Sequence, residues 1–261
     1  MTKSSFPTFV EDISKNAILH AGKMAKEFKK KISVTYKSEN QPVTNADLAI
    51  DNYLKSFFNQ NTPSYGWVSE ETNDNGSRLS SNFFWCLDPI DGTRSYINGK
   101  PEYTISLALI KNHQPILGYV FNPETEELFY AKKNGGAFCN DKKIVVSKIN
   151  DISSSKFAIS SSEVKKLKKF NFFDNYNIVE MGSIAYKIAL VAKGKIDVAI
   201  SFTKKNDWDL AASDLILKEA GGVCNKITGK KIVYNTSKMT IESVIATNSQ
   251  LIKKLFLKFN E

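Results

Sequence analysis

The sequence predicts a mixed α/β (α+β) fold that begins with helices, continues with paired strands and ends with alternating strands and helices. In the first third of the chain, apolar residues recur every three or four positions, as on one face of a helix. In the middle, apolar runs follow one another at hairpin spacing, and in the last third they alternate with helical patterns. The 261 residues are 42% hydrophobic and 24% charged, which supplies enough apolar surface for a core.

Two helices and one strand are expected in the N-terminal third. The apolar face of the first helix spans residues 9–28. The second helix begins at Thr44, because Asp47 three residues later completes a pattern like a capping box, and it ends before the turn residues 61–63. Between the two helices, residues 32–36 are expected to form a strand.

Four strands are expected in the middle of the chain. The first is a short apolar run of the kind found in a buried strand, and three more follow with turn-forming residues between them. The strands cover 83–87, 103–110, 115–121 and 126–131, with turns at 112–114 and 122–124.

Strands and helices alternate in the last third. The last long helix stops at two consecutive glycines, Gly221 and Gly222, which favour a helix end. The sequence has no internal repeat, so residues 1–261 are expected to form a single domain, with a soft division near 140–155 where polar residues dominate. The expected strands are 157–160, 177–180, 196–202 and 243–247, and the expected helices are 163–170, 183–193, 209–220 and 250–259.

The formal charge of +9 comes from 36 basic and 27 acidic residues. Only Arg78 and Arg94 are arginines, whereas surfaces that read nucleic acids rely on arginine for bidentate contacts. A non-enzymatic protein that binds nucleic acid, another anion or a membrane surface by charge is a distant alternative. The chain lacks a basic amphipathic helix and an aromatic-glycine RNA signature, so no nucleic-acid polymer is expected as a partner.

The distribution of apolar residues and cysteines predicts a cytoplasmic protein. No apolar run approaches 18 residues, so no integral membrane segment is expected. The first ten residues lack the continuous apolar stretch of a secretory signal. Three widely spaced cysteines, Cys86, Cys139 and Cys224, fit a reducing compartment.

The densest chemical signal is the segment DPIDGT at residues 88–93. The strand expected at 83–87 delivers Asp88 at its carboxyl end, Pro89 turns the chain, and Asp91 follows. Gly92 allows a ligand to approach the backbone closely. A short helical turn is expected next, and its free N–H groups favour an anion. Two carboxylates beside such a site suggest Mg²⁺ together with a phosphate.

Three further acids strengthen this interpretation. Glu70 lies in the acidic stretch 69–72, Asp209 lies where a helix begins, and Asp47 lies in the first turn of its helix. Each of these could be a helix cap or a surface residue when considered alone. Four separate segments that offer acids around a Gly-Thr turn together predict a site for more than one metal ion, in which metals bind a phosphate and activate water.

These segments resemble the inositol monophosphatase family. The DPIDGT segment is similar to its first signature, and WDLAA at 208–212 with EAGG at 219–222 is similar to its second. The pair Glu70-Glu71 matches its acidic loop, and Asp47 its early helix aspartate. Order and spacing fit from about residue 10 to residue 255. The resemblance implies a layered α/β/α/β/α sandwich of the inositol monophosphatase and fructose-1,6-bisphosphatase type.

The resemblance also implies Mg²⁺-dependent hydrolysis of phosphate monoesters, often inhibited by Li⁺, in a protein that can be a homodimer. Two or three Mg²⁺ ions are implied at the site. Glu70, Asp88 and the carbonyl group of Ile90 would hold the first ion. Asp88, Asp91 and Asp209 would hold the second, with Asp88 bridging the two.

The same resemblance implies the residues that meet a small phosphorylated substrate. The backbone N–H groups of Gly92 and Thr93 would bind the phosphate. Asp47 and Thr93 would orient or deprotonate the attacking water, with Glu70 beside them. Ser183 and Asp209 would lie against the rest of the substrate.

The identity of the substrate depends on the loop that precedes Trp208. Animal inositol monophosphatases have a ring-binding glutamate there, whereas this chain places Ser201 or Phe202 at that position with a spacing one residue longer. Lys204 and Lys205 could instead meet a second phosphate. The stretch 206–214 looks more like bacterial 3′(2′),5′-bisphosphate nucleotidases, which favours adenosine 3′,5′-bisphosphate. Inositol 1-phosphate or another sugar or polyol phosphate is the alternative, followed by histidinol phosphate and fructose bisphosphate.

Other phosphatase and kinase chemistries fit poorly. No cysteine has an arginine six positions away, and the DxDx[TV] pattern fails because Ala211 stands at its last position. The chain also lacks a GxxxxGK[ST] loop. Its two histidines, His20 and His113, fall in an amphipathic helix and a turn, so histidine catalysis is not expected.

Overall fold

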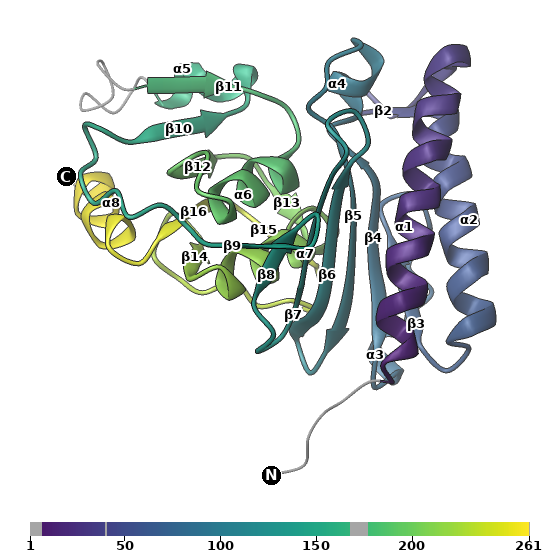
Figure 1. The fold of residues 1–261 in the computed structure, drawn as a ribbon. Coiled ribbons are helices and arrows are strands. Elements are labelled where there is room, and N and C mark those ends of the chain that lie inside the picture. Colours follow the sequence, from purple (N-terminus) through teal and green to yellow (C-terminus); the bar gives the residue numbers. More distant parts are fainter. Residues whose placement is uncertain (1–6, 40, 168–176, 261) are drawn as a thin grey trace.

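Five layers stack in the order helix, sheet, helix, sheet, helix (Figure 1). This computed structural model describes residues 7–39, 41–167 and 177–260. The layered sandwich implied by the resemblance is confirmed. Among the described residues, no helix is both long enough and apolar enough to cross a membrane.

The larger sheet has seven strands in the order β3-β4-β5-β6-β7-β8-β9. β3 runs parallel to β4, and every later neighbour is antiparallel. The strands are β3 (Gly66–Ser69), β4 (Phe84–Asp91), β5 (Thr104–Lys111), β6 (Gln114–Asn122), β7 (Glu127–Lys132), β8 (Ala137–Cys139) and β9 (Lys142–Ile144).

The outer face of this sheet is covered by α1 (Phe9–Phe28) and α2 (Asn45–Asn61) (Figure 1). Side chains alternate along a strand, so each strand supplies both faces of the sheet. In β4, Trp85 packs with the outer helices, whereas Phe84 and Cys86 belong to the core on the opposite face.

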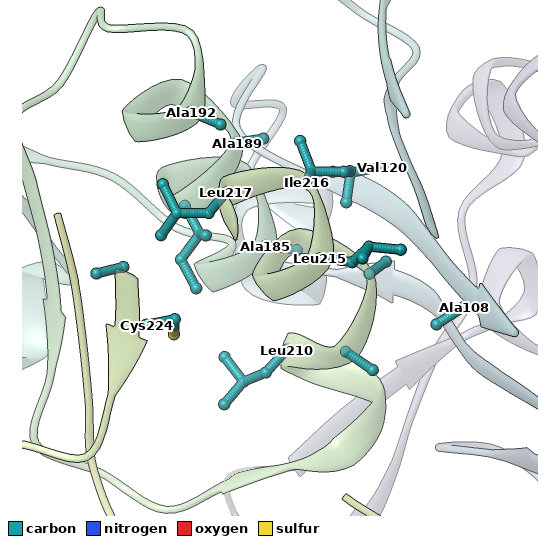
Figure 2. Packing of buried hydrophobic residues seen from close by; sticks show 14 of the residues in the cluster. Ala108, Val120, Ala185, Ala189, Ala192, Leu210, Leu215, Ile216, Leu217 and Cys224 are labelled. Atoms are coloured by element: carbon teal, nitrogen blue, oxygen red, sulfur yellow. The ribbon is translucent and has the colours of Figure 1, made fainter. Parts of the chain in front are cut away.

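The middle layer consists of α6 (Ile184–Ala192) and α7 (Asp207–Glu219). Figure 2 shows α7 side chains directed to both sheets, with Ile216 toward Val120 and Leu210 toward Cys224. A helix between two sheets must be buried all round, which explains why every residue of 210–217 is buried.

The smaller sheet has five strands in the order β11-β10-β12-β16-β14, and α8 (Leu251–Asn260) covers its far face. β10 is parallel to β11 and β12, whereas β16 is antiparallel to β12 and β14. The strands are β10 (Lys156–Ile159), β11 (Asn177–Glu180), β12 (Val198–Ser201), β14 (Gly222–Asn225) and β16 (Val244–Asn248).

Short elements lie around the edges of the two sheets. Two of them matter for the site: the hairpin of β1 (Val34–Ser38) and β2 (Gln41–Thr44), and the pair of β13 (Lys205–Asn206) and β15 (Thr240–Ile241). The others are η1 (Lys29–Lys31), α3 (Ser77–Ser80), α4 (Thr93–Ile97), η2 (Ser161–Glu163) and α5 (Val164–Leu167).

The predicted elements are found with small shifts at their ends, and one boundary is wrong. The strand expected at 83–87 continues to Asp91, so Pro89 does not end it. The helix expected at 163–170 is observed as η2 and α5 up to Leu167, and its remainder lies outside the described residues. The short strands β2, β3, β8, β9, β13, β14 and β15 and the short helix α3 were not predicted.

Candidate active site

A β-bulge in β4 brings two of the predicted metal ligands to one side of the larger sheet. Asp88 pairs with Ser106 and Asp91 with Thr104, so β4 holds one extra residue between the two pairs. Pro89 lies in this interval and cannot donate a ladder hydrogen bond. In a regular strand, residues three apart face opposite sides. The extra residue cancels this alternation for the two aspartates.

Three carboxylates meet where β4 and α7 approach each other. Asp88, Asp91 and Asp209 each offer an oxygen, and these oxygens lie within 4.8 Å of one another. All three were predicted as ligands of one ion. The carbonyl of Ile90 lies in the same strand, where it accepts a hydrogen bond of 3.0 Å from Thr93 Oγ1.

Hydrogen bonds to one oxygen fix the orientation of each carboxylate. Asp88 Oδ1 accepts from the N–H of Ile90 at 3.1 Å. Asp91 Oδ2 accepts from the Ser183 hydroxyl and from the N–H of Ala185, both at 2.6 Å. The second oxygen of each side chain can then serve as a ligand without disturbing these bonds.

Asp209 and Asp47 are positioned by the same local device. Asp209 is the third residue of α7, and its Oδ2 accepts from the N–H of the helix-capping Asn206 at 2.5 Å. Asp47 is the third residue of α2, and its Oδ2 accepts from the N–H of Thr44 at 2.8 Å. These capping boxes hold both acids in the first turn of a helix. The hydroxyl of Thr93 lies 3.5 Å from Asp47 Oδ1.

Crowding of acids in a buried place shifts their pKa values upward. Burial, followed by the negative charges of Glu70, Asp91 and Asp209, raises the pKa of Asp88 well above its usual range. Burial and then repulsion from Asp91 raise the pKa of Asp209 to about 7. Burial likewise raises the pKa of Asp91.

The pKa values of two further acids of the site are also raised. Burial raises the pKa of Asp47 to about 6. For Glu70, partial burial and then repulsion from Asp209 raise the pKa to about 8, although a third of its side chain stays exposed.

The donor set fits Mg²⁺. Hard divalent cations prefer carboxylate and carbonyl oxygens, which are the groups that converge here. A bound cation would relieve the repulsion that raises these pKa values. The residues present therefore suit the metal that the resemblance implies.

Gly92 provides the close backbone approach at the end of β4. Its φ of +95° lies in the region that favours glycine. A Cβ atom there would lie 2.9 Å from the carbonyl oxygen of Glu102 and 3.0 Å from the nitrogen of Ser183. Gly92 and Thr93 both line a cleft beside the carboxylates.

A cleft of about 560 Å³ opens beside the carboxylates. It contains seven of the predicted site residues: Glu70, Gly92, Thr93, Ser183, Lys204, Lys205 and Asp209. Its lining also includes the hydroxyl-bearing residues 160–162. Five cationic side chains line it and favour an anionic ligand: Lys37, Arg94, Lys100, Lys204 and Lys205. A second cavity of about 590 Å³ lies beside β14 and contains none of the predicted site residues.

The sequence did not single out two lysines near the site. Lys37, on the β1–β2 hairpin, forms ion pairs with Glu71 at 2.7 Å and with Glu70 at 3.5 Å. Lys187 of α6 is 1% exposed, and its ammonium donates to Ser160 Oγ at 2.8 Å. A lysine inside the apolar helical pattern of 183–193 was the one available signal for Lys187.

Cys86 and His113, to which the sequence assigns no catalytic role, lie as follows. Cys86 is buried in the core between the sheet and the middle helices. His113 contacts the carbonyl oxygen of Tyr234 at 2.9 Å.

The sequence of residues 8–258 matches the family described as "Inositol monophosphatase family". A relative from Aquifex aeolicus named "Fructose-1,6-bisphosphatase/inositol-1-monophosphatase" is 33% identical over 226 residues, which are 81% of this chain and 83% of the relative. A "3′(2′),5′-bisphosphate nucleotidase CysQ" from Aggregatibacter actinomycetemcomitans is 29% identical over 218 residues, 80% of each chain.

The fold is similar to solved structures over nearly its full length. The IMPase of Thermotoga maritima superposes with a TM-score of 0.86 at 25% identity, covering 97% of both chains.

Proposed function

The chain belongs to the inositol monophosphatase family of Mg²⁺-dependent phosphatases. We propose that it hydrolyses the 3′-phosphate monoester of adenosine 3′,5′-bisphosphate in preference to other substrates. The observation that carries this proposal is the cleft in which a converging set of carboxylates adjoins five cationic side chains. The carboxylates suit metal ions, and the cations suit a substrate with more than one anionic group. In this proposal residues 1–261 form one catalytic domain, because Asp91 and Asp209 come from opposite sides of the division near 140–155.

We assign the metal ligands as the resemblance implies them. Glu70, Asp88 and the Ile90 carbonyl would hold one ion, and Asp88, Asp91 and Asp209 would hold a second. When bound, Mg²⁺ neutralises phosphate charge and lowers the pKa of water.

The resemblance implies the remaining roles, and the geometry around Thr93 is compatible with them. Its hydroxyl lies between the Ile90 carbonyl and Asp47 Oδ1, so it can orient a water molecule between substrate and carboxylate. Asp47 accepts the proton of that water at Oδ1, with a pKa near 6 that leaves it ionised at neutral pH. The N–H groups of Gly92 and Thr93 bind the phosphate oxygens, and Glu70 lies beside the attacking water.

The preference for a bisphosphate is supported by the loop between β12 and α7. Lys204 and Lys205 line the cleft, and they follow shortly after Ser201 or Phe202, which stands where the resemblance puts a substrate-binding glutamate in animal relatives. A cationic pair suits a second phosphate better than a ring of hydroxyl groups. The similarity to a bisphosphate nucleotidase favours the same choice.

Inositol 1-phosphate, or another sugar or polyol phosphate, is the second candidate. The Aquifex aeolicus relative, which is named for two such activities, favours it. The hydroxyl groups of residues 160–162 on the cleft wall are compatible with a polyol.

The test compares phosphate release from adenosine 3′,5′-bisphosphate and inositol 1-phosphate, each with and without Mg²⁺. We expect Mg²⁺-dependent release with a higher kcat/KM for the nucleotide. A higher kcat/KM for inositol 1-phosphate would replace the first candidate by the second. Release that persists without Mg²⁺, or no release from either substrate, would contradict both candidates.

A further inference from the structure

We infer that Glu163 is a positioning residue, which fixes the ammonium group of Lys205 in the cleft through a chain of two hydroxyl groups. The inference rests on the proposed function, since it concerns how the cleft meets a second anionic group of the substrate. Glu163 is 2% exposed and is absent from the described lining of the cleft. It therefore acts on the substrate through other residues.

The carboxylate of Glu163 is anchored to the end of β12. Its Oε1 accepts a hydrogen bond of 2.6 Å from the N–H of Phe202. The hydroxyl of Ser201 lies 3.1 Å from Oε1 and 3.0 Å from Oε2. Ser201 is the last residue of β12 and is fully buried. The carboxylate of Glu163 is therefore bonded to the end of a strand rather than to an exposed loop.

Two further contacts carry this anchor to the cleft. The hydroxyl groups of Ser201 and Thr203 lie 3.1 Å apart, and the Lys205 ammonium donates to Thr203 Oγ1 at 2.8 Å. Lys205 lines the cleft together with Asp209. Four side chains thus connect a buried carboxylate to an ammonium group that faces the substrate space.

The chemistry of the two ends determines the direction of every hydrogen bond in the chain. A lysine ammonium can only donate, and an ionised carboxylate can only accept. Thr203 therefore accepts from Lys205 and donates to Ser201, and Ser201 donates to Glu163. With each hydroxyl used once as donor and once as acceptor along this path, the relay has a single arrangement of protons.

This arrangement matters because a lysine side chain is flexible. Lys204 is exposed, whereas Lys205 is half-buried and is held by Thr203. An ammonium that is already ordered loses less rotamer freedom when an anion binds. We therefore assign to the relay the preorganisation of Lys205 for the second anionic group of the substrate.

The cleanest variant is Thr203→Val, which removes the hydroxyl and keeps the branched shape. Glu163→Gln is less specific, because the Glu163 charge also attracts the buried Lys187 ammonium. Thr203→Ser restores a hydroxyl and should rescue the effect. Thr125→Val is the matched control, since Thr125 is exposed in the β6–β7 turn and its hydroxyl bonds to Glu127.

The kinetic test compares adenosine 3′,5′-bisphosphate with adenosine 3′-monophosphate, which lacks the second phosphate. We expect Thr203→Val to raise KM for the bisphosphate about tenfold, and to change its kcat and the KM for the monophosphate by less than about twofold. Equal effects on both KM values, or no effect, would overturn the assignment.

A second measurement does not depend on activity. Acetylation of lysines by a small reagent, followed by peptide mass spectrometry, compares Lys205 with Lys204 as an internal reference. In the wild-type protein we expect Lys205 to react more slowly than Lys204. This protection should be lost in Thr203→Val and kept in Thr203→Ser. An unchanged Lys205 rate in Thr203→Val would overturn the relay. If the wild-type protein shows no preference for the bisphosphate, the proposed function fails. The labelling result still decides whether the hydrogen-bond chain from Glu163 fixes Lys205.

Discussion

The hydroxyl of Ser183 donates a hydrogen bond of 2.6 Å to Oδ2 of Asp91. The same oxygen of Ser183 accepts from the N–H of Tyr186 at 3.0 Å and so caps α6. Ser183 does this with a φ of +46°, which is uncommon for a residue with a side chain. One side chain therefore links the start of a middle-layer helix to the carboxylates of the larger sheet.

Replacing Ser183 by alanine tests this link. We expect the free energy of unfolding to fall by about 1 kcal/mol through loss of the cap. The Mg²⁺ concentration for half-maximal phosphate release should rise at least about tenfold, because a carboxylate that lacks its orienting partner binds metal less well. Ser153→Ala, which removes a surface hydroxyl bonded to Asp151, is the control. An unchanged Mg²⁺ requirement in Ser183→Ala would contradict the orienting role.

Asp91→Asn should abolish turnover and leave the fold intact. The amide oxygen can still accept from Ser183 and Ala185, while the negative charge that a cation needs is lost. Circular dichroism and the melting temperature report the fold, and phosphate release reports turnover. Unchanged turnover in a folded Asp91→Asn protein would show that this carboxylate does not hold a metal.

The pH dependence of kcat should report Asp47. Burial raises its pKa to about 6, and only the ionised form can accept a proton. We expect kcat to fall about tenfold per pH unit below about pH 6 and to level off above it. Thr44→Val removes a hydroxyl that donates to Asp47 Oδ2 and should move this limb to higher pH. A profile that stays flat down to pH 5 would exclude Asp47 as the base.

Removal of metal should make stability depend on pH. The pKa values of Asp88, Asp209 and Glu70 are raised in the folded chain, to about 7 for Asp209 and about 8 for Glu70. For acids with raised pKa values, the stabilising contribution is present below the unfolded pKa and is lost as pH rises through the folded pKa. Chelator-treated protein should therefore lose stability between about pH 4 and about pH 8. Added Mg²⁺ should restore the melting temperature most strongly at pH 8, and restoration that is equal at pH 5 and pH 8 would contradict this linkage.

Cys86→Ala should leave catalysis unchanged. Cys86 packs on the face of β4 that meets the middle helices, so its loss creates a small cavity that costs about 1 kcal/mol. Cys224→Ala, in the smaller sheet, is the matched control and should cost a similar amount. Loss of phosphate release from a well-folded Cys86→Ala protein would mean that the thiol takes part in the chemistry.

Local patterns predicted those parts of the site that depend on neighbouring residues. The capping box at Thr44 placed Asp47 correctly, and the helix start near Trp208 placed Asp209. The segment 88–93 indicated two acids and a close backbone approach. The bulge at Pro89 could not be predicted, because it depends on the register of β4 against β5.

Features that join distant parts of the chain were beyond the sequence patterns. Glu163 stands in a short helical segment with no motif around it, and only the fold brings it to Ser201. The four residues of β3 are too few for a clear pattern, and their parallel pairing with β4 places Glu70 beside Leu87. Lys37 reaches the acids from a hairpin whose pairing is likewise set by tertiary contacts.

The hydrogen bond between Ser183 and Asp91 also relates catalysis to the folding reaction. A chain that has assembled only α1, α2 and the larger sheet already holds Asp47, Asp88 and Asp91, but Asp209 and the cap from Ser183 arrive with the middle helices. Contacts between residues far apart in sequence require a long loop to close before they stabilise anything. Recovery of phosphate release during refolding is therefore expected to report docking of the C-terminal half, and to follow the recovery of secondary structure in time.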